Sequence, residues 1–223
     1  MIQTPGQKKR AAFFDLDLTL TYRDCFRLFL MHFYFERVSR LLYLPYLFYI
    51  MVLRKVRLIT LKSFKEKAMK GLKGLTKEEI REIGTLFFKR SLKSVLRRQA
   101  LEKIRQHQKK GDLVFIISAS PDIYVHEVSR FLGCDGYACT RLDFVNKRFD
   151  GHIKGKDCLG KEKQARMYSF AKKYKIDLGV SSAYSDHESD IIFLKTAGKK
   201  IVVTPTRVLN NIARANDWEI VNW

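Results

Sequence analysis

Two spacings of apolar residues alternate along this chain. Short apolar runs of the kind found in buried strands end at Asp15 and recur over residues 112–118, 182–185 and 200–204. Helical spacings follow these later runs, with helices expected to begin near Asp122, His187 and Thr206 and a further helix over residues 161–174. Strands that alternate with helices predict an α/β fold, a doubly wound, Rossmann-like parallel sheet with helices on both faces.

The segment between the first two strands has a different character. From Cys25 to about residue 108 there is no convincing alternating stretch, and the apolar residues fall at helical spacings. The sequence therefore predicts a helical cap, residues 25–108, inserted into a core formed by residues 1–24 and 109–223. Within the core, residues 137–153 hold two short β-like runs around Asn146-Lys147, which predicts a small β-hairpin.

Two carboxylates follow the first strand. Asp15 and Asp17 stand two residues apart and therefore face the same side of an extended segment, and the hydroxyl of Thr19 follows them. Carboxylates this close repel each other, and bound Mg²⁺ relieves the repulsion in an oxygen-rich site that holds a phosphate. An Asp-rich turn after a strand is the structural alternative, since Asp favours turns and helix caps.

Three polar residues stand where predicted strands end. In a doubly wound sheet the binding crevice lies at the carboxyl ends of the strands. Asp15, Ser118 and Asp186 each occupy such a position, so we expect them to meet at one edge of the sheet. Taken singly, Ser118 also fits a helix cap and Asp186 a solvated helix start.

Charge and cysteine content narrow the setting of the protein. The 223 residues include 43 Lys and Arg against 23 Asp and Glu, a formal net charge of +20. This excess favours a polyanionic partner: nucleic acid, an anionic membrane or a phosphorylated substrate. The alternative is a basic surface that is simply solvated. No nucleic-acid-binding module is present, so nucleic acid is not the expected partner. The four cysteines form no Cys-x-x-Cys pair, and the N-terminus has no apolar secretory signal, which together predict a reducing, cytoplasmic setting.

Four motifs, in order, resemble those of the haloacid dehalogenase superfamily, in its phosphoserine-phosphatase-like branch. They are Asp15-Leu-Asp-Leu-Thr19, Ser118 after Val-Phe-Ile-Ile, Lys163 in Cys-Leu-Gly-Lys-Glu-Lys, and Asp186-His-Glu-Ser-Asp190. Any one of them is weak, but together they are strong and extend over essentially the whole chain. The resemblance implies a phosphomonoester hydrolase whose helical cap selects the substrate.

The resemblance also implies a role for each catalytic residue. Asp15 would attack phosphorus and form an aspartyl-phosphate, while Asp17 would protonate the leaving oxygen and then deprotonate the hydrolytic water. Ser118 and the backbone amides after it would bind the phosphoryl oxygens, and Lys163 would offset their charge. Lys161 is a rival for the last role, but the family spacing Cys-x-Gly-x-x-Lys favours Lys163.

The same resemblance implies a Mg²⁺ site and a set of substrate contacts. The metal ligands would be the Asp15 carboxylate, the Asp17 backbone carbonyl and Asp186, with Asp190 a further ligand or an orienting group. The substrate contacts would be Thr19, Asp24, Ser118, Ala119 and Lys163.

Two positions depart from the family pattern. Leu18 stands where the family often has glycine or another small residue. Ala119-Ser120-Pro121 follows the second motif, where phosphoserine phosphatases have a Gly-Gly pair that lets the substrate approach the backbone. The second departure argues against phosphoserine itself as the substrate.

The predicted cap contains an unusual apolar run. Residues 41–53 are thirteen positions without a charge, flanked by Arg37, Arg40, Arg54, Lys55 and Arg57. A transmembrane helix needs about 20 apolar residues, so the run is too short to span a bilayer. It fits an interfacial segment kinked at Pro45, with tyrosines at headgroup depth, or else a buried helix of the cap. Residues 54–110 carry 19 Lys and Arg against 5 Asp and Glu, which favours an anionic membrane surface.

These features lead to one hypothesis and two alternatives. The apolar segment, Asp24 and the forms of the second and third motifs resemble bacterial lipid-phosphate phosphatases of the phosphatidylglycerophosphatase C type. We expect a Mg²⁺-dependent phosphatase, peripheral on the cytoplasmic face of the inner membrane, that acts on a lipid phosphate such as phosphatidylglycerophosphate. The alternatives are a soluble phosphatase for a small metabolite such as phosphoserine, and a basic nucleic-acid-binding protein on the same scaffold.

Overall fold

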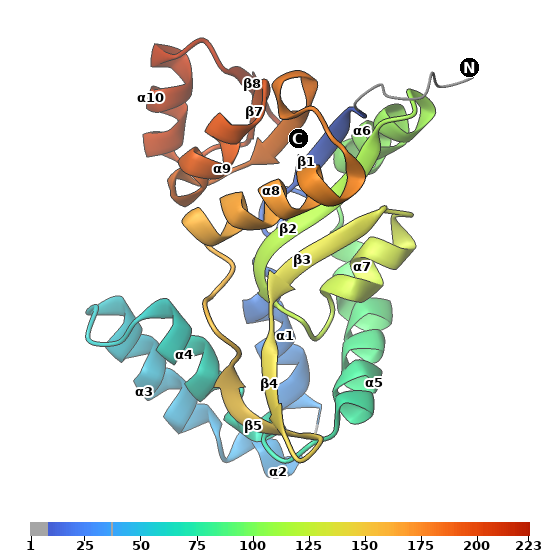
Figure 1. The fold of residues 1–223 in the computed structure, drawn as a ribbon. Helices are drawn as coiled ribbons and strands as arrows, with labels where there is room; N and C mark the ends of the chain where they lie inside the picture. The colour runs from blue at the N-terminus through green and yellow to red at the C-terminus, as the bar shows by residue number, and fades with distance from the viewer. Residues whose placement is uncertain (1–8, 37) are drawn as a thin grey trace.

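A six-stranded parallel sheet forms the centre of one lobe of the molecule in the computed structural model, which describes residues 9–36 and 38–223 (Figure 1). The strands lie in the order β3-β2-β1-β6-β7-β8. Their bounds are β1 Ala11–Phe14, β2 Leu113–Pro121, β3 Gly136–Thr140, β6 Ser182–Ser185, β7 Lys199–Val203 and β8 Glu219–Val221. The predicted α/β fold with a parallel sheet is confirmed.

Helices cover both faces of this sheet. On one face lie α6 (Arg98–Lys109) and α7 (Val125–Phe131), and on the other lie α8 (Lys161–Tyr174), α9 (Ile191–Thr196) and α10 (Arg207–Ala215). Alternate residues of a strand point to opposite faces, so Phe13 enters the apolar cluster shared with α8, α9 and α10. Its neighbour Phe14 enters the second cluster, which continues into the other lobe. The helix predicted over residues 161–174 is present with those bounds.

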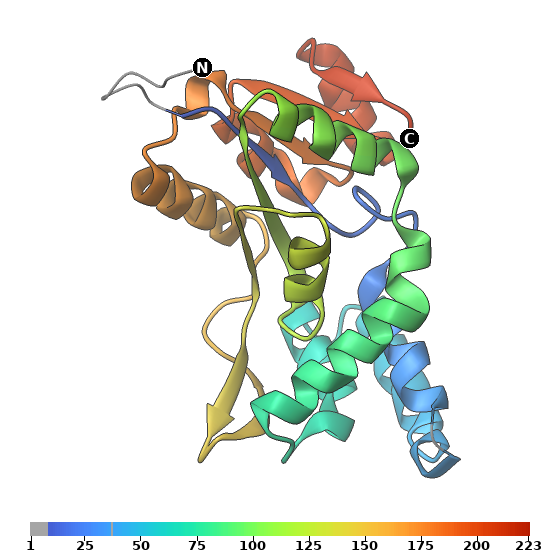
Figure 2. The ribbon, with the colours of Figure 1, turned by 90° about the vertical axis from the view of Figure 1, so that its right-hand side faces the viewer.

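Most of the chain between β1 and β2 builds a second, mainly helical lobe (Figure 2). Its helices are α1 Cys25–Phe35, α2 Val38–Leu41, α3 Leu44–Lys55, α4 Leu61–Ala68 and α5 Lys77–Phe87, with 3₁₀ turns at Lys70–Leu72 and Lys93–Val95 and a π-helical turn at Phe88–Leu92. The antiparallel pair β4 (Leu142–Val145) and β5 (Arg148–Ile153) joins this lobe, because Phe149 exchanges backbone hydrogen bonds with Gly74 (2.9 Å) and Leu75 (2.8 Å). Two further 3₁₀ turns, Leu178–Val180 and Glu188–Asp190, lie in the first lobe.

The hairpin is shorter than predicted, because its first part belongs to the main sheet. Residues 136–140 form β3, which pairs in parallel with β2. The antiparallel pair occupies residues 142–153 and turns at Asn146 and Lys147, whose φ angles of 49° and 64° are those of a type I′ turn. Strand β8 was not predicted, since three residues are too few to show a period.

The structure does not test every boundary of the predicted core and cap. Residues 1–8 of the predicted core, and Arg37 beside the apolar run, lie outside the described residues. The division into a core and a cap at residues 25–108 stays a prediction. Helix α6 ends at Lys109, beside the predicted end of the cap at residue 108. It contacts β1 and β2 and so covers the sheet.

Candidate active site

Asp15 stands directly after β1, where the chain turns back on itself. Its backbone N–H donates to the carbonyl of Tyr184 on the neighbouring strand β6 (3.0 Å), which fixes Asp15 at the carboxyl edge of the sheet. Leu18 then adopts a left-handed conformation with φ of 58°, unusual for a residue with a side chain. The N–H of Leu20 donates to the carbonyl of Leu16 (2.9 Å) and closes the turn beside Asp15.

Lys163 lies against Asp15 inside the protein. Its Nζ is 2.6 Å from Oδ1 of Asp15 and 2.5 Å from Oδ2 of Asp190, and its side chain is only 2% exposed. Ser185 at the end of β6 donates to the same Asp190 oxygen (2.7 Å). The rival residue Lys161 is exposed at the start of α8. The structure therefore brings Lys163, and not Lys161, to the carboxylates of the first and fourth motifs.

Burial and mutual charge shift the pKa values of this cluster. Burial raises the pKa of Asp15 well above its usual value; Lys163 opposes the shift, and Asp190 and Asp186 add to it. Burial acts to lower the pKa of Lys163, but the carboxylates of Asp15 and Asp190 outweigh it and raise that pKa. Burial likewise raises the pKa of Asp186 to about 6, against the opposing effects of Lys163 and a hydrogen bond from Thr19.

Thr19 connects the first and fourth motifs. Its hydroxyl lies 3.1 Å from Oδ1 of Asp186 and 3.5 Å from Oδ2 of Asp15, and the side chain is fully buried. Its position between the two carboxylates follows from the turn at Leu18, which folds the loop back over the strand end. The predicted contact of Thr19 with substrate stays a prediction, since its hydroxyl has protein acceptors.

Asp17 points toward the second motif. Its Oδ2 accepts hydrogen bonds from Ser120 (2.6 Å) and Ser118 (3.3 Å), and its Oδ1 accepts one from the backbone N–H of Cys25 (2.6 Å). Asp24 lies close by as the N-cap of α1, and burial, followed by the charge of Asp17, raises its pKa. Sequence reasoning named Ser120 only as a departure from the family, whereas the structure makes it the nearest hydroxyl to Asp17.

Ala119 is held by residues that the sequence analysis did not select. Its carbonyl accepts hydrogen bonds from Nζ of Lys65 on α4 (2.6 Å) and from the hydroxyl of Thr140 (2.8 Å). Lys65 also pairs with both oxygens of Asp157 at 2.8 Å, so a buried ion pair links the two lobes next to Ser118. Lys65 was one of several basic residues of the predicted cap, and nothing in the sequence separated it from the others.

Arg97 supports the loop after Asp15 from the outside. Its guanidinium donates to the carbonyls of Leu18 (3.2 Å) and Thr21 (3.1 Å), and also to the carbonyl of Trp223. Backbone carbonyls in a tight turn have few other donors, so this fork fixes the loop that carries Asp17 and Thr19. The sequence offered no signal for this role, because Arg97 lies in a run rich in basic residues.

The cluster holds more negative charge than Lys163 neutralises. Among the described residues, Asp15, Asp186 and Asp190 surround a single ammonium group, and Oδ1 of Asp190 is buried without a hydrogen-bond partner. Within residues 9–36 and 38–223, no three Asp, Glu, His or Cys side chains form a ready-made metal cluster. Mg²⁺ commonly uses one or two carboxylates together with carbonyl oxygens, waters and a substrate phosphate. A donor set of Asp15, the Asp17 carbonyl and Asp186 fits that preference.

The chain is similar in part to a curated bacterial protein. It is 29% identical over 119 residues to the phosphoserine phosphatase SerB1 of Mycobacterium tuberculosis. The match covers 53% of this chain and 39% of that protein, so it spans well under half of the relative's length.

Solved structures share the fold over nearly the whole chain. A protein of unknown function from Bordetella pertussis Tohama I superposes with a TM-score of 0.86 at 22% identity, covering 96% of this chain and 99% of that one. A substrate-bound phosphoserine phosphatase superposes with a TM-score of 0.66 at 21% identity, covering 97% and 93%. The family profile of haloacid dehalogenase-like hydrolases matches residues 12–195, the range that contains all four motifs. The chain therefore belongs to the haloacid dehalogenase-like hydrolase family.

Proposed function

We propose that this protein is a Mg²⁺-dependent phosphomonoester hydrolase that acts through an aspartyl-phosphate on a membrane lipid phosphate. The observation that carries the chemistry is the asymmetric environment of the Asp15 carboxylate. One oxygen is bound by Lys163 at 2.6 Å, while the other, Oδ2, lies 3.5 Å from the hydroxyl of Thr19, which is nearer to Asp186 at 3.1 Å. An oxygen with free lone pairs at the carboxyl edge of the sheet is placed to attack phosphorus.

In the first half-reaction, Oδ2 of Asp15 bonds to phosphorus and the bond from phosphorus to the leaving oxygen breaks. Asp17 acts as the general acid and gives a proton to that oxygen, so the product leaves as an alcohol. Ser118 shares the Asp17 oxygen at 3.3 Å, which places a hydroxyl donor beside the transferring group. Lys163 offsets the charge that gathers around Asp15.

In the second half-reaction, water attacks the phosphorus of the aspartyl-phosphate and gives its proton to Asp17. The bond between phosphorus and Asp15 breaks, inorganic phosphate leaves, and both aspartates return to their starting states. Mg²⁺ held by Asp15, the Asp17 carbonyl and Asp186 would neutralise charge on the phosphoryl oxygens. Asp190 and Ser185 hold Lys163 in place from the other side of the cluster.

The lipid part of the proposal rests on the exposure of α3. Only Leu47 and Ile50 of this helix are buried, so the run is not the fully buried cap helix that was one of the two interpretations. Pro45 stands in the first turn of α3, where a missing N–H costs nothing, and does not kink the helix. Large apolar side chains of the helix are exposed instead: Phe48 69%, Tyr49 58%, Met51 45% and Val52 42%.

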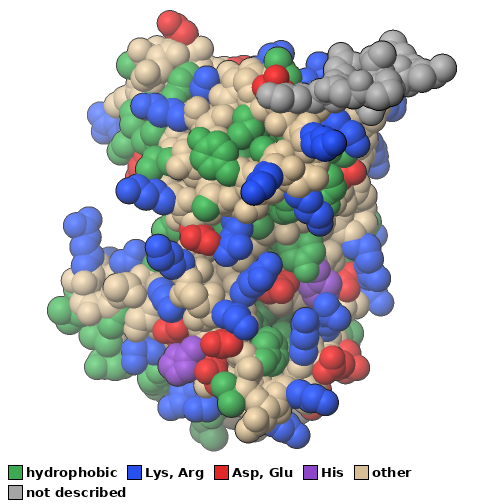
Figure 3. Space-filling view, viewed as in Figure 1, with side chains coloured by type: hydrophobic (Ala, Val, Ile, Leu, Met, Phe, Trp, Pro, Cys, Tyr) green, Lys and Arg blue, Asp and Glu red, His purple; other side chains and the backbone are tan. Residues whose placement is uncertain are grey.

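Further apolar side chains are exposed on neighbouring segments. They stand on the second half of α1, on α2 and on the loops beside α3, at Met31, Phe35, Val38, Leu42, Val56 and Leu58. Figure 3 shows hydrophobic side chains at the rim of the lobe that contains α3, with basic side chains beside them. We name these residues and the exposed ones of α3 the α3 surface. None of the described helices is long and apolar enough to cross a bilayer.

An exposed apolar surface next to basic residues suits the interface of an anionic bilayer. Arg54, Lys55 and Arg57 follow the apolar residues of α3 directly, within a chain of net charge +20. Shallow insertion on the cytoplasmic face of the inner membrane would bring the crevice to a lipid phosphate such as phosphatidylglycerophosphate. The similarity to the phosphoserine phosphatase SerB1 favours a second candidate, phosphoserine. Against it stand Ala119 and Ser120, whose side chains occupy the positions of the Gly-Gly pair.

A substrate comparison tests the proposed function. With Mg²⁺, we expect kcat/KM for phosphatidylglycerophosphate in mixed vesicles to exceed that for phosphoserine at least about tenfold, which corresponds to roughly 1.4 kcal/mol of transition-state binding. A preference for phosphoserine would replace the lipid substrate by the small metabolite. Turnover of neither compound, nor of an aryl phosphate, would refute the proposed hydrolase.

Replacing two residues of the α3 surface should weaken membrane binding. The double variant Phe48→Ser/Val52→Ser removes two exposed apolar side chains one helical turn apart, so we expect at least about tenfold weaker co-sedimentation with anionic vesicles. The matched control is Tyr168→Ser/Val208→Ser, which removes similar exposed side chains from α8 and α10 and should bind like the wild type. Equal recovery of both variants with the vesicles would remove the α3 surface as the docking face.

A further inference from the structure

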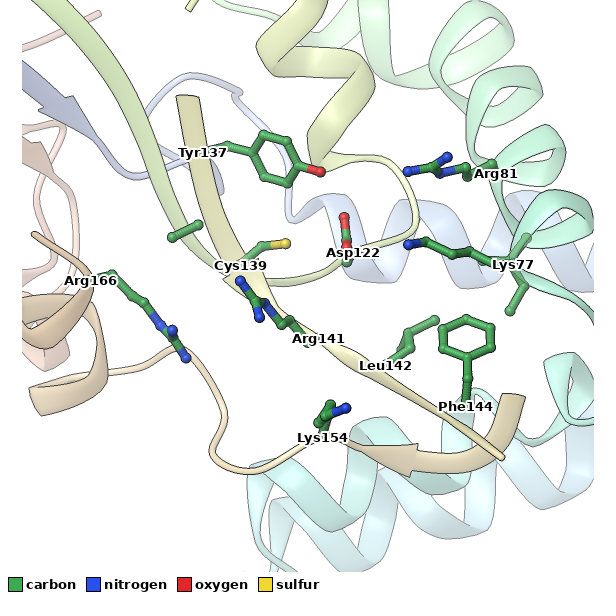
Figure 4. Close-up of a pocket in the computed structure, with 12 residues that line it drawn as sticks. Lys77, Arg81, Asp122, Tyr137, Cys139, Arg141, Leu142, Phe144, Lys154 and Arg166 are labelled. Carbon is green, nitrogen blue, oxygen red and sulfur yellow. The ribbon is translucent and has the colours of Figure 1, made fainter. Parts of the chain in front are cut away.

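A cavity of about 540 Å³ lies beside the edge strand β3. Figure 4 shows that helix α5, strand β3 and the segments around β4 and α8 surround it. Five of its lining side chains are cationic: Lys77, Arg81, Arg141, Lys154 and Arg166. One carboxylate, Asp122, and the phenol of Tyr137 complete its polar lining. A cavity of this size holds a ligand as large as a metabolite.

The cations of this cavity have little compensation from the protein. Among the described residues, Arg166 pairs with Glu162 at 2.7 Å, whereas Lys77, Arg81, Arg141 and Lys154 take part in no ion pair. Their charges come from different parts of the chain and converge across the cavity (Figure 4). Five cations face a single lining carboxylate, Asp122, so the cavity has an excess of positive charge that attracts an anion.

This cavity shares no lining residue with the cluster of Asp15, Asp17, Ser118 and Lys163. Thr140, at the end of β3, donates to the carbonyl of Ala119 in the candidate active site, whereas Tyr137, Ala138 and Cys139 before it line the cavity.

We propose that this cavity is a binding site for a small polyanion with two or more phosphate or carboxylate groups. Guanidinium groups bind such anions through paired, charge-assisted hydrogen bonds, and Arg81 and Arg141 approach from two elements. Ile80, Leu142 and Phe144 supply apolar contacts for the body of the ligand. The same chemistry belongs to a soluble metabolite and to an anionic lipid headgroup.

Cations of both lobes line the cavity, so a bound polyanion would connect them. Lys77 and Arg81 belong to α5 of the helical lobe, while Arg166 belongs to α8, which covers the sheet. Binding here is independent of the catalytic proposal, because it needs no turnover to be observed.

Isothermal titration of the full-length protein with tripolyphosphate tests this inference. The variant Arg81→Gln/Arg141→Gln removes two cavity charges, and we expect it to bind tripolyphosphate at least about tenfold more weakly than the wild type. The control Lys172→Gln/Lys195→Gln removes two exposed charges from α8 and α9 and should change the affinity less than about twofold. Hydrolysis of an aryl phosphate should stay the same in both variants.

A second arm with vesicles identifies the source of the anion. Loss of both tripolyphosphate binding and anionic-vesicle binding in the cavity variant assigns a lipid headgroup, and loss of tripolyphosphate binding alone assigns a soluble polyanion; both results support the site. Equal affinities of the cavity variant and the control for both probes would overturn it. Loss of aryl-phosphate hydrolysis in the cavity variant would also overturn it, because the cavity would then belong to the catalytic crevice.

Discussion

The variant Asp15→Asn should lose hydrolysis of an aryl phosphate by roughly a thousandfold or more, the scale on which removal of a nucleophile acts. An amide lacks the negative charge that attacks phosphorus, and it forms no acyl-phosphate under these conditions. Its size is nearly that of the carboxylate, so the contact with Thr19 and the packing under β6 stay in place. The measurement is the steady-state rate with Mg²⁺, together with the circular dichroism of the folded variant.

The control for this variant is Asp217→Asn, which makes the same chemical change at an exposed position far along the sequence. Asparagine tolerates the positive φ of 53° found there, so the control should keep both fold and rate. If Asp15→Asn turns over the aryl phosphate at a rate near that of the control, Asp15 is not the nucleophile.

The variant Lys163→Met should destabilise the protein by about 3–5 kcal/mol, because it leaves carboxylates buried without their cation. Lys163 is 2% exposed and touches both Asp15 and Asp190, so no water replaces the lost ammonium group without a rearrangement. For a chain of this size, the melting temperature should fall by roughly 10 °C. Thermal denaturation measures the loss, and the aryl-phosphate rate should fall with it.

Lys161→Met provides the comparison, since Lys161 lies two residues away on the exposed side of α8. That change should stay within about 0.5 kcal/mol of the wild type. A loss of stability as large for Lys161→Met as for Lys163→Met would show that the buried contact with Asp15 is not the cause. Raised Mg²⁺ should rescue part of the Lys163→Met stability, because it supplies another cation to the same carboxylates.

The main sheet was accessible to sequence reasoning because its central strands are buried on both faces. Such strands are often continuous apolar runs, as β1, β2 and β7 are, whereas β6 is short, has serine at both ends and shows only a strand-like pattern. Strand β3 was assigned to the hairpin because residues 137–140 show no period of their own, and only pairing with β2 reveals their place. Register of this kind is a tertiary property, which local residue spacing does not contain.

The residues of the candidate site likewise divide into those that sequence reasoning found and those that it missed. Asp15, Lys163, Asp186 and Asp190 come from three sequence segments, and the structure brings them within hydrogen-bonding distance of one another, directly or through Thr19. The rule that strand ends share one edge of the sheet grouped Asp15 with Asp186, whereas Lys163 and Asp190 were added by the family resemblance. The supporting residues Lys65, Arg97 and Asp157 escaped notice, since each acts through a contact more than 50 positions away in the sequence.

The sequence also did not predict which side chains of α3 are exposed. A helix that is apolar on all sides gives no direction in which to point its buried face. The structure supplies that direction through Leu47 and Ile50, which pack inward and leave Phe48 and Val52 outside.

The ion pair between Lys65 and Asp157 helps to hold the two lobes together. Both side chains are nearly covered, at 5% and 11% exposure, and the same ammonium group holds the carbonyl of Ala119. Separating the lobes would expose both groups to water and to salt ions, which weaken the attraction between exposed charges. The rate at which the crevice opens and releases product should therefore depend on ionic strength. The rate of the chemical step at phosphorus, which takes place inside the closed crevice, should not.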